Sequence, residues 1–388
     1  MHSVRVAGVG STQFGKQPER ASRDLFAEAG AGALADAGVP HADVEFVAYG
    51  NFAGEAVEGQ GHAGPLAADA LGVDAPATRY EAACASSGVA FREGVRAVRA
   101  GDADVVVAGG AERLSHLDTA HTTEALASAA DELWEGRAGA TFPGVYALMA
   151  DAYFGEYGGT REDLAHVAVK NHANAMGNPH AQFQREVTVA DVLDAPPVAD
   201  PLGLLDACPI TDGASAVVLA SEAYVAEHDV DAPVAVTGSG QGGDRLALAD
   251  RAHLARTPAA SAAADAAYAD AGVTPADVDV AEVHDCFTIA EVLALEALGF
   301  YGHGDAIGAA RAGETTRDGR LPVNLSGGLK AKGHPVGATG TSQIAELTAL
   351  LRGDHHNADA VPDAEVALAH NAGGTVASAV VHVLEVAE

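Results

Sequence analysis

The sequence predicts an α/β protein built from two related halves, and two observations carry this prediction. The first is an internal repeat, since ADAGVPHADVEFVAYGN at 35–51 returns as ADAGVTPADVDVAEVHD at 269–285. The second is the alternation of short β-branched strands with alanine-rich helices along the chain, a pattern typical of sheets covered by helices. Because the repeated text includes a helix end, a turn and the following strand, we attribute it to duplication of one folding unit.

Each half opens in the same way, with a β-branched strand that we expect to be followed by a glycine-rich turn. The two openings are VRVAGVGSTQFG at 4–15 and VAVTGSGQGG at 234–243. We place the junction near 229–233, which gives an N-terminal half over 1–230 and a C-terminal half over 231–388.

Later elements continue the alternation in chain order. The sequence predicts a buried strand at 102–112, a strand leading into a helix at 213–228, and a further strand pair at 366–387. Residues from about 115 to 205 have no counterpart in the second half and contain polar, irregular text such as KNHANAMGNPHAQFQ. We interpret this segment as an insertion in the first half, and insertions on a rigid scaffold usually carry specificity.

Composition limits the class of protein. A hydrophobic content of 48% and a mean hydropathy of +0.08 favour a globular protein over a disordered one. No run of about 18 apolar residues occurs, and the N-terminal text lacks the features of a signal peptide, so we expect a cytoplasmic protein without a membrane partner. The three cysteines are far apart and lack CxxC spacing, which argues against a disulfide framework or a zinc site.

The charge balance is strongly acidic. There are 54 Asp and Glu residues against 22 Lys and Arg, and the net charge is −32 at pH 7. The acids are scattered along the chain, and few of the bases are lysines. This composition suits a cytosol at molar salt, where the Debye length falls to about 3 Å and repulsion between like charges is screened. We therefore expect a halophilic source and no nucleic acid among the partners.

Cys84 lies between a predicted strand, ATRYEAAC, and a predicted helix, ASSGVAFREGVRAVRA, which Gly101 ends. At this turn the thiol would meet the positive end of the helix dipole, so we expect its pKa to fall below the free value of about 8.5. Small neighbours such as Ala83 and Gly88 leave room for a substrate. Cys84 is therefore a candidate nucleophile, although buried and inert cysteines occur in similar surroundings.

A second group of reactive side chains follows the apolar strand text AEV at 281–283. His284, Asp285 and Cys286 come together at its end. Ionisable residues at the end of a buried strand need partners or a function. The repeat aligns this site with the residues GN at 50–51, so the second half has gained the reactive groups.

Two glycine-rich segments complete the candidates. NLSGGLKAKGHPVGATGTSQ at 324–343 allows close backbone approach and carries His334, and it lacks the phosphate-binding pattern GxxxxGK[ST]. HNAGGT at 370–375 follows a strand, and its backbone N–H groups can serve an oxyanion. Two thiols, two histidines and a glycine turn suit acyl transfer with carbon–carbon bond formation or cleavage, which needs a nucleophile, acid/base groups and oxyanion donors.

These motifs resemble the thiolase superfamily and, within it, the archaeal, sterol-carrier-protein-like thiolases. The resemblance covers essentially the whole chain and rests on Cys84 with Ser86, on HDCF at 284–287 and on GHPVGATG at 333–340. It implies a thiolase fold, in which two duplicated βαβαβαββ halves pack as a five-layer αβαβα sandwich. With the acidic composition, it implies a haloarchaeal source.

The resemblance also implies an activity, that of an acyl-CoA C-acyltransferase or β-ketothiolase. Such an enzyme condenses two acyl-CoA molecules to 3-ketoacyl-CoA and CoA, or runs the reverse cleavage, through an acyl-cysteine. In the implied roles, Cys84 takes the acyl group and His334 activates it. Cys286 handles the α-proton, because HNAGG stands where better-known thiolases carry a second catalytic cysteine in a CxGG motif. His284 and His334 hold the thioester oxygen, and the N–H groups of Cys84 and Gly374 form a second oxyanion site.

Coenzyme A is polyanionic, so an acidic protein needs a local basic surface to bind it. Between residues 311 and 332, five cations outnumber two acids. The candidate residues for substrate or CoA binding are Ser326, Gly327, Lys330, Lys332 and His172. No permanently bound cofactor and no metal are expected.

Two other functions remain open at this point. A decarboxylating 3-ketoacyl synthase shares the fold and the combination of one cysteine with two histidines, and a thiolase-fold scaffold subunit would need no chemistry. The resemblance further implies a homodimer or tetramer and a small, separately encoded companion with an OB-fold and a zinc ribbon. Cys208, which precedes a proline and a buried strand, is expected to be structural.

Overall fold

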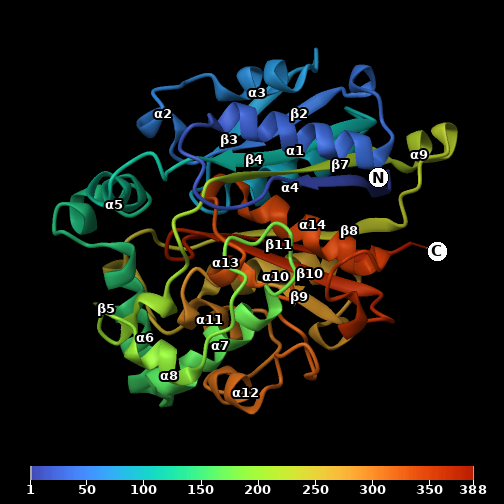
Figure 1. The fold of residues 1–388 in the computed structure, drawn as a ribbon. Helices are drawn as coiled ribbons and strands as arrows, with labels where there is room; N and C mark the ends of the chain where they lie inside the picture. The colour runs from blue at the N-terminus through green and yellow to red at the C-terminus, as the bar shows by residue number, and fades with distance from the viewer. Residues whose placement is uncertain (1, 388) are drawn as a thin grey trace.

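The same strand order occurs twice in the molecule, once in each half of the chain (Figure 1). The computed structural model describes residues 2–387. Its main sheet has the order β3-β2-β4-β7-β1-β8-β11-β10-β9, and β5 and β6 form a separate pair. The strands are β1 Val4–Ser11, β2 Phe46–Gly50, β3 Ala77–Tyr80, β4 Val105–Glu112, β5 Pro197–Ala199, β6 Leu202–Gly203, β7 Gly213–Ser221, β8 Val234–Gly243, β9 Val280–Glu282, β10 Val366–Gly373 and β11 Ser378–Val386.

Counted from the start of each half, both half-sheets have the order 3-2-4-5-1. In the second half, the segment at Val323 takes the place of the third strand and bridges Ala281 of β9 in parallel. The directions agree as well: β2 is parallel to β3 and β4, and β9 is parallel to β10. The last strand of each half, β7 or β11, is antiparallel to both of its neighbours. The predicted α/β fold of two duplicated halves is confirmed.

Helices cover both half-sheets. Their bounds are α1 Ser22–Ala37, α2 Gly54–Val57, α3 Ala63–Leu71, α4 Ser86–Ala100, α5 Thr119–Ala127, α6 Phe142–Tyr157, α7 Arg161–Asn174, α8 Val189–Asp194, α9 Glu222–His228, α10 Pro258–Ala271, α11 Thr288–Ala297, α12 Ala306–Ala312, α13 Gly328–Ala331 and α14 Thr339–Arg352. Short 3-10 turns lie at His41–Asp43, Leu204–Asp206, Leu248–Asp250, Pro275–Asp277, Val336–Ala338 and Ala358–Ala360, and one π turn lies at Glu132–Gly136.

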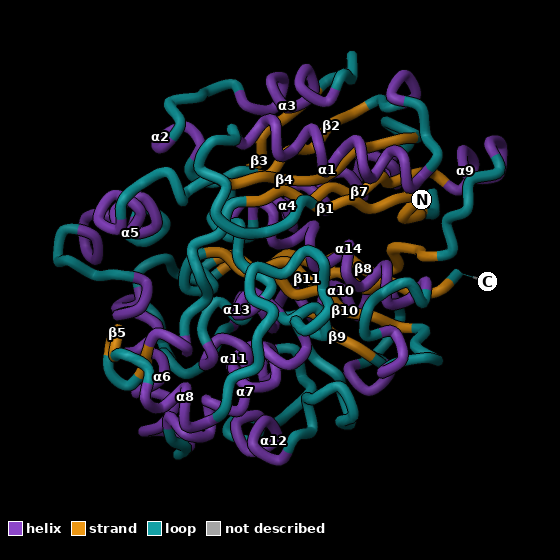
Figure 2. The backbone as a smooth tube through the Cα atoms, viewed as in Figure 1, coloured by secondary structure: helices purple, strands orange, loops and turns teal. Residues whose placement is uncertain are grey.

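These elements stack in five layers. α1 and α3 cover the outer face of the first half-sheet, α4 and α14 lie between the two half-sheets, and α10 and α11 cover the outer face of the second (Figures 1 and 2). Three hydrophobic cores fill the interfaces between these layers. The first includes Phe26 of α1, the second Ile344 of α14 and the third Val292 of α11. The predicted αβαβα sandwich is therefore confirmed.

The glycines at the start of each half lie inside strands, so the expected glycine turns are wrong. A Cβ on Gly8 of β1 would lie 2.3 Å from the carbonyl oxygen of Ala33 in α1. A Cβ on Gly240 of β8 would lie 2.0 Å from the carbonyl oxygen of Ala263 in α10. In both halves the glycines let an alanine-rich helix approach the strand closely, which backbone without a side chain permits.

The segment that we interpreted as an insertion forms α5–α8 with β5 and β6. Although it belongs to the first half of the chain, α6 and α7 pack on α11, α12 and α13 of the second half. Figure 1 shows these green helices beside the orange ones. Within residues 2–387, none of the helices has the length and apolarity needed to cross a bilayer.

Candidate active site

Cys84 lies in the turn between β3 and α4. The preceding residue, Ala83, has a φ of 51°, in the left-handed region that residues with a Cβ adopt at a cost. Ser86 holds this turn, because its hydroxyl donates to the carbonyl of Ala83 (2.6 Å) and accepts from the N–H of Ala82 (3.1 Å). The turn presents the Cys84 thiol just before the first residue of α4.

Three of the predicted site residues meet in space. The sulfur of Cys84 and one ring nitrogen each of His284 and His334 all lie within 4.8 Å of one another. The two imidazole rings are edge to face, with centroids 5.1 Å apart. The thiol comes from the first half of the chain and both rings come from the second. A thiol beside two imidazoles suits nucleophilic catalysis, and the same three atoms are also of the type that can hold a zinc ion.

The hydrogen bonds of His334 define which ring nitrogen is the base. Its Nδ1 lies 2.6 Å from the hydroxyl oxygen of Thr339, and that hydroxyl donates its own proton to the carbonyl of Pro335 (3.0 Å). The Thr339 oxygen therefore accepts from Nδ1–H, which leaves the lone pair on Nε2. Burial lowers the pKa of His334 to about 3, so the ring is neutral at physiological pH.

The predicted lowering of the Cys84 pKa is wrong. Burial raises the pKa of the Cys84 thiol to about 12, and the carboxylates of Glu112 and Glu81 add to the rise. Hydrogen bonds from the backbone N–H groups of Gly374 and of Cys84 itself act in the opposite direction. The loss of water around the sulfur outweighs these dipoles, so the resting nucleophile is a neutral thiol.

Cys286 is buried in contact with Tyr146, a residue that the sequence did not single out. The Tyr146 hydroxyl donates its one proton to the carbonyl of Gly374 (2.9 Å). When it is turned toward Cys286 instead, the same hydroxyl lowers the pKa of that thiol. Burial and the neighbouring thiols of Cys208 and Cys84 raise the same pKa well above its ordinary value. Tyr146 also stacks on Phe287, with ring centroids 4.7 Å apart. The inserted segment thus reaches the reactive thiols.

Cys208, expected to be structural, lies at the same site. Its N–H donates to the carbonyl of Cys286 (2.9 Å). Ala207, which precedes Cys208, and Phe287, which follows Cys286, form an antiparallel bridge. Burial raises the pKa of Cys208 to about 12. No spacing in the sequence links Cys208 to Cys286, because the contact joins the end of the insertion to the second half.

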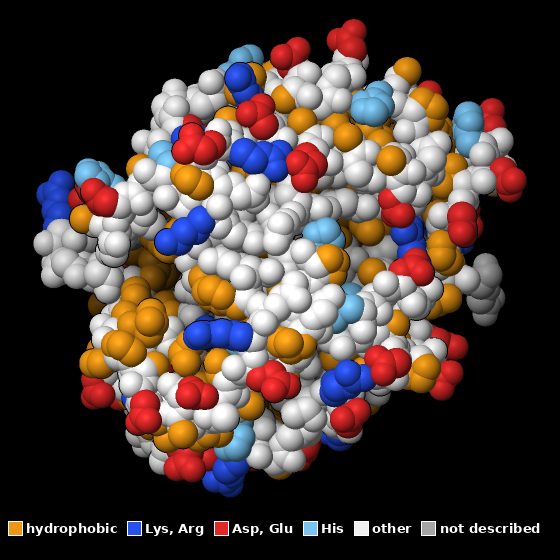
Figure 3. Space-filling model, in the orientation of Figure 1, with side chains coloured by type: hydrophobic (Ala, Val, Ile, Leu, Met, Phe, Trp, Pro, Cys, Tyr) orange, Lys and Arg blue, Asp and Glu red, His pale blue; other side chains and the backbone are white. Residues whose placement is uncertain are grey.

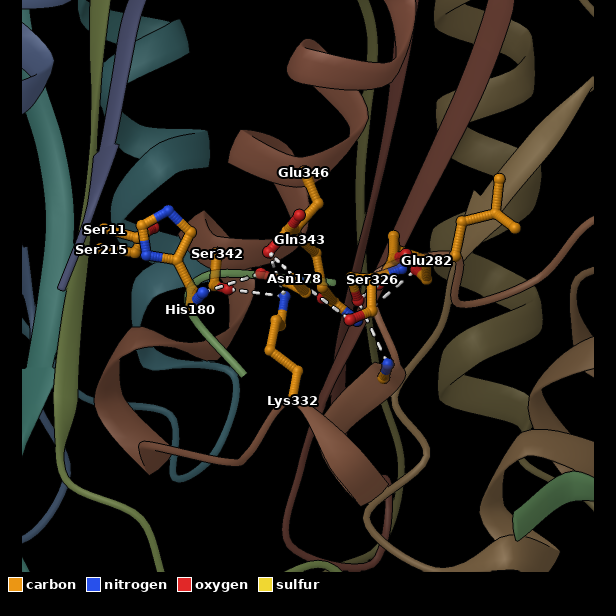
Figure 4. A network of polar contacts seen from close by, with 12 residues as sticks. Ser11, Asn178, His180, Ser215, Glu282, Ser326, Lys332, Ser342, Gln343 and Glu346 are labelled. Atoms are coloured by element: carbon orange, nitrogen blue, oxygen red, sulfur yellow. Dashed lines mark hydrogen bonds and ion pairs between the residues drawn. The ribbon is translucent and has the colours of Figure 1, made fainter. Parts of the chain in front are cut away.

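Lys332, a candidate for CoA binding, is buried within a network of polar side chains (Figure 4). Its ammonium lies 3.3 Å from the carboxylate of Glu346 and donates to the hydroxyl of Ser342 (2.8 Å). His355 lies 3.0 Å from the other carboxylate oxygen. Lys332 therefore neutralises a buried acid, and its part in binding CoA stays a prediction.

The other predicted binding residues are also internal. Lys330 is 2% exposed, and burial lowers its pKa. Ser326 donates to the carboxylate of Glu282 (2.6 Å). A Cβ on Gly327 would lie 2.5 Å from Ala175, so this glycine serves close packing.

His172 faces the interior as well. Its Nδ1 lies 3.1 Å from the carbonyl of Arg185, and burial lowers its pKa to about 4. None of these five side chains offers a surface charge to a polyanion, and their contacts with substrate or CoA stay a prediction. The residues are Ser326, Gly327, Lys330, Lys332 and His172.

A buried polar network fixes the loop that carries His284 and Cys286. Asp285 accepts hydrogen bonds from the backbone N–H of Leu329 (2.7 Å) and from the side chain of Asn171 (2.7 Å). Asn171 also donates to Glu291, which pairs with Lys170 (2.8 Å). The polar text KNHAN of the insertion therefore holds this loop in place rather than contacting substrate.

Comparisons with known proteins identify the family. Residues 4–223 match the model "Thiolase, N-terminal domain", and residues 240–386 match "Thiolase C-terminal domain-like". The chain is 47% identical to an acetyl-CoA acetyltransferase of Methanothermobacter thermautotrophicus over 384 residues, which cover 99% of both chains. It is 33% identical to human sterol carrier protein 2 over 388 residues, which cover 96% of this chain and 70% of that protein.

A solved structure agrees with this result. The chain matches the Ltp2-ChsH2(DUF35) aldolase with a TM-score of 0.84 and 27% identity, covering 99% of this chain and 98% of that one. Matches of both halves in order, together with full-length relatives, leave one conclusion: the chain belongs to the thiolase family.

Proposed function

We propose that the protein is an acyl-CoA C-acyltransferase, which condenses two acyl-CoA molecules to 3-ketoacyl-CoA and CoA and catalyses the reverse cleavage. The observation that carries this proposal is the cluster of the Cys84 thiol with the imidazoles of His284 and His334, all within 4.8 Å. Full-length similarity to an acetyl-CoA acetyltransferase supports acetyl-CoA as one substrate.

In the first step, Nε2 of His334 takes the proton of the Cys84 thiol as the sulfur attacks the thioester carbon of acyl-CoA. The N–H groups of Cys84 and Gly374 stabilise the tetrahedral oxyanion. The carbon–sulfur bond to CoA then breaks, and the leaving thiolate takes the proton from His334. The products are acyl-Cys84 and free CoA.

In the second step, the proton of the Cys286 thiol passes to Nε2 of His334, which is neutral again after CoA has left. The Cys286 thiolate, supported by the hydroxyl of Tyr146, then removes an α-proton from a second acyl-CoA. His284 donates to the thioester oxygen as enolate charge develops, and His334 does so when it holds a proton. The enolate carbon attacks the acyl carbon on Cys84, and the sulfur of Cys84 leaves. The imidazolium of His334 gives its proton to the leaving sulfur of Cys84 and Cys286 keeps the α-proton, so both thiols and the neutral imidazole are restored.

A cavity of about 230 Å³ that shares lining residues with the hydrophobic cluster around Cys84 supports a substrate site. Its apolar lining includes Phe142 of α6 together with Leu117 and Leu126, which pack on the same hydrophobic cluster as Cys84. Lys16 lies at the same cavity and replaces the buried lysines as the candidate cation for substrate binding.

The test is CoA-dependent cleavage of 3-ketoacyl-CoA substrates from C4 upward in molar KCl, with Cys84→Ala as the control. The same thiol with two imidazoles also fits a decarboxylating 3-ketoacyl synthase, so malonyl thioesters are tested in parallel. Turnover of malonyl thioesters without cleavage of 3-ketoacyl-CoA would favour the synthase. Failure to trap radioactive acetyl on Cys84 would favour a scaffold subunit.

Association with other chains is part of the proposal. We propose a homodimer or tetramer that works with a small OB-fold, zinc-ribbon companion. The name of the solved relative joins two proteins, Ltp2 and ChsH2(DUF35), which supports a second protein. Trp134 and Leu133, 74% and 61% exposed after α5, are candidates for that contact. Full activity of the purified chain alone would exclude a required companion.

We also propose a cytoplasmic location in a haloarchaeal cell, and the surface charge supports the salt environment. Figure 3 shows acidic side chains scattered over the visible face rather than gathered in one patch. The net charge is −32, so the carboxylates on this surface repel one another at low salt, and this repulsion is screened at molar salt.

A further inference from the structure

Asn371, in the segment HNAGGT, lies between the nucleophile and one imidazole. It is 1% exposed and belongs to β10, next to the site. Its Nδ2 donates to the carbonyl oxygen of Cys84 (3.1 Å) and lies 3.1 Å from Nδ1 of His284. The sequence pointed only to the glycines of this segment, so the amide has no role in the proposed function.

The orientation of the amide follows from its neighbours. The Cys84 carbonyl can only accept hydrogen bonds, so the NH₂ group and not the oxygen faces it. The amide oxygen is wedged between two helices, since a Cβ on Gly88 or on Gly340 would lie 2.7 or 2.5 Å from it. The amide group therefore cannot exchange its two ends without placing its oxygen against another oxygen.

This orientation determines where His284 carries its proton. Because an NH₂ group only donates, Nδ1 of His284 must hold a lone pair, and the neutral ring is protonated on Nε2. That Nε2 has no hydrogen-bond partner within residues 2–387. The titratable groups facing the ring are Cys84, His334 and His370. Burial lowers the pKa of His284, and His334 and His370 add to this, so the ring stays neutral.

The two imidazoles thus have opposite tautomers. Thr339 accepts from His334 and leaves its Nε2 as a base, whereas Asn371 donates to His284 and leaves its Nε2–H as a donor. The ring centroids are 5.1 Å apart and both rings are buried and neutral. Without Thr339 and Asn371, nothing would fix one ring as the base and the other as the hydrogen-bond donor.

We propose that Asn371 is a positioning residue that sets the Nε2–H tautomer of His284 and so makes this ring the permanent hydrogen-bond donor to the substrate's thioester oxygen. The tautomer stands on hydrogen bonds alone, and the role toward substrate rests on the proposed acyltransferase function. His334 can donate only after it has taken a proton, whereas His284 donates throughout the enolate step.

The first experiment reads the tautomer directly. In protein labelled with ¹⁵N-histidine, nitrogen NMR distinguishes a protonated ring nitrogen from one with a lone pair, and the signals lost in His284→Asn identify the ring. We expect Nε2–H alone in the unmodified protein and a mixture of both tautomers in Asn371→Leu. Protonation on Nδ1 in the unmodified protein, or an unchanged tautomer in Asn371→Leu, would overturn the proposal. This readout is independent of activity.

The second experiment separates the two half-reactions. Because a mixture of tautomers keeps part of the rings protonated on Nε2, we expect Asn371→Leu to slow condensation and cleavage by the factor that the NMR populations give, while Cys84 still takes acetyl from acetyl-CoA. Complete loss of this oxyanion donor, which lowers kcat roughly 10²- to 10³-fold, is the limit of the effect. Asn357→Leu removes another buried amide, which donates to the carbonyls of Asn174 and Leu325, and should leave both the tautomer and kcat unchanged. Equal losses in both variants, or a normal kcat in Asn371→Leu with an altered tautomer, would contradict the proposal. Absence of acylation in the unmodified protein would instead count against the proposed function.

Discussion

The protonation state of Cys84 gives the sharpest test of the site. With a pKa of about 12, the thiol is ionised in roughly one molecule in ten thousand at pH 8, against about one in four for a free cysteine of pKa near 8.5. The thiolate is the species that reacts with alkylating reagents, and its fraction in Cys84 is roughly two thousandfold lower than in free cysteine. Because a thiolate of higher pKa is also a stronger nucleophile, iodoacetamide should modify Cys84 roughly 50- to 100-fold more slowly than free cysteine. Peptide mass spectrometry after timed quenching measures this rate for each thiol.

Two controls define the outcome. In guanidinium chloride all three cysteines should react at the rate of free cysteine, since unfolding removes the burial that raises their pKa values. His334→Ala should leave the slow rate of Cys84 unchanged, because the neutral imidazole does not stabilise a thiolate at rest. Rapid alkylation of native Cys84 that is lost in His334→Ala would reveal a thiolate–imidazolium pair and refute this reasoning.

Four further predictions follow from named contacts. Tyr146→Phe removes the hydroxyl that lowers the pKa of Cys286, so exchange of α-deuterium from labelled acetyl-CoA should slow about tenfold, the effect of a hydrogen bond of about 1.4 kcal/mol. Lys332→Met leaves Glu346 buried without its counter-charge and should lower the free energy of unfolding, measured in urea, by about 3–5 kcal/mol. The KM for acyl-CoA should stay unchanged, and a raised KM would support a contact between Lys332 and CoA. Lys332 is the main cause that lowers the pKa of Glu346, against the effect of burial. The folded protein therefore binds fewer protons than the unfolded one, and it loses stability as the pH falls below the ordinary carboxyl pKa of 4.5. Glu346→Gln should remove this part of the pH dependence in thermal melts. The melting temperature should rise with KCl up to molar concentration, where the Debye length falls to about 3 Å, and a flat response would contradict the proposed halophilic origin.

The sequence was most informative where the chain is local or repeated. The helix from Ser86 to Gly101 and the helix starting at Thr288 lie where the residue pattern predicts them. The division into two similar halves could be anticipated because the text of one unit occurs twice, whereas the order of strands within each sheet is known from the structure. The pKa of Cys84 was predicted with the wrong sign, because the helix dipole is visible in sequence and the removal of water around the sulfur is not.

Residues that act through distant contacts could not be found in this way. Tyr146 lies in a helix without a motif, and its hydroxyl reaches Cys286 and Gly374 only because the insertion packs on the second half. Lys332 was predicted to lie at the surface, because nothing in the sequence marks Glu346 of α14 as its buried partner. Asn371 was not predicted, because the interpretation of its segment rested on the neighbouring glycines. Each of these contacts depends on packing between layers, which periodicity does not encode.

The duplication also explains why the site lies between the halves. α4 and α14 occupy equivalent places in the two halves, and their first turns meet, since a Cβ on Gly340 would lie 2.4 Å from the backbone nitrogen of Gly88. Cys84 precedes α4 and His334 precedes α14, so the packing of the two copies brings the nucleophile of one to the base of the other. At the end of β2, a Cβ on Gly50 would lie 2.5 Å from the backbone nitrogen of Ser87, so this strand end serves the packing of α4. The equivalent end of β9 is free of that constraint, and it is there that the chain carries His284 and the acid/base thiol.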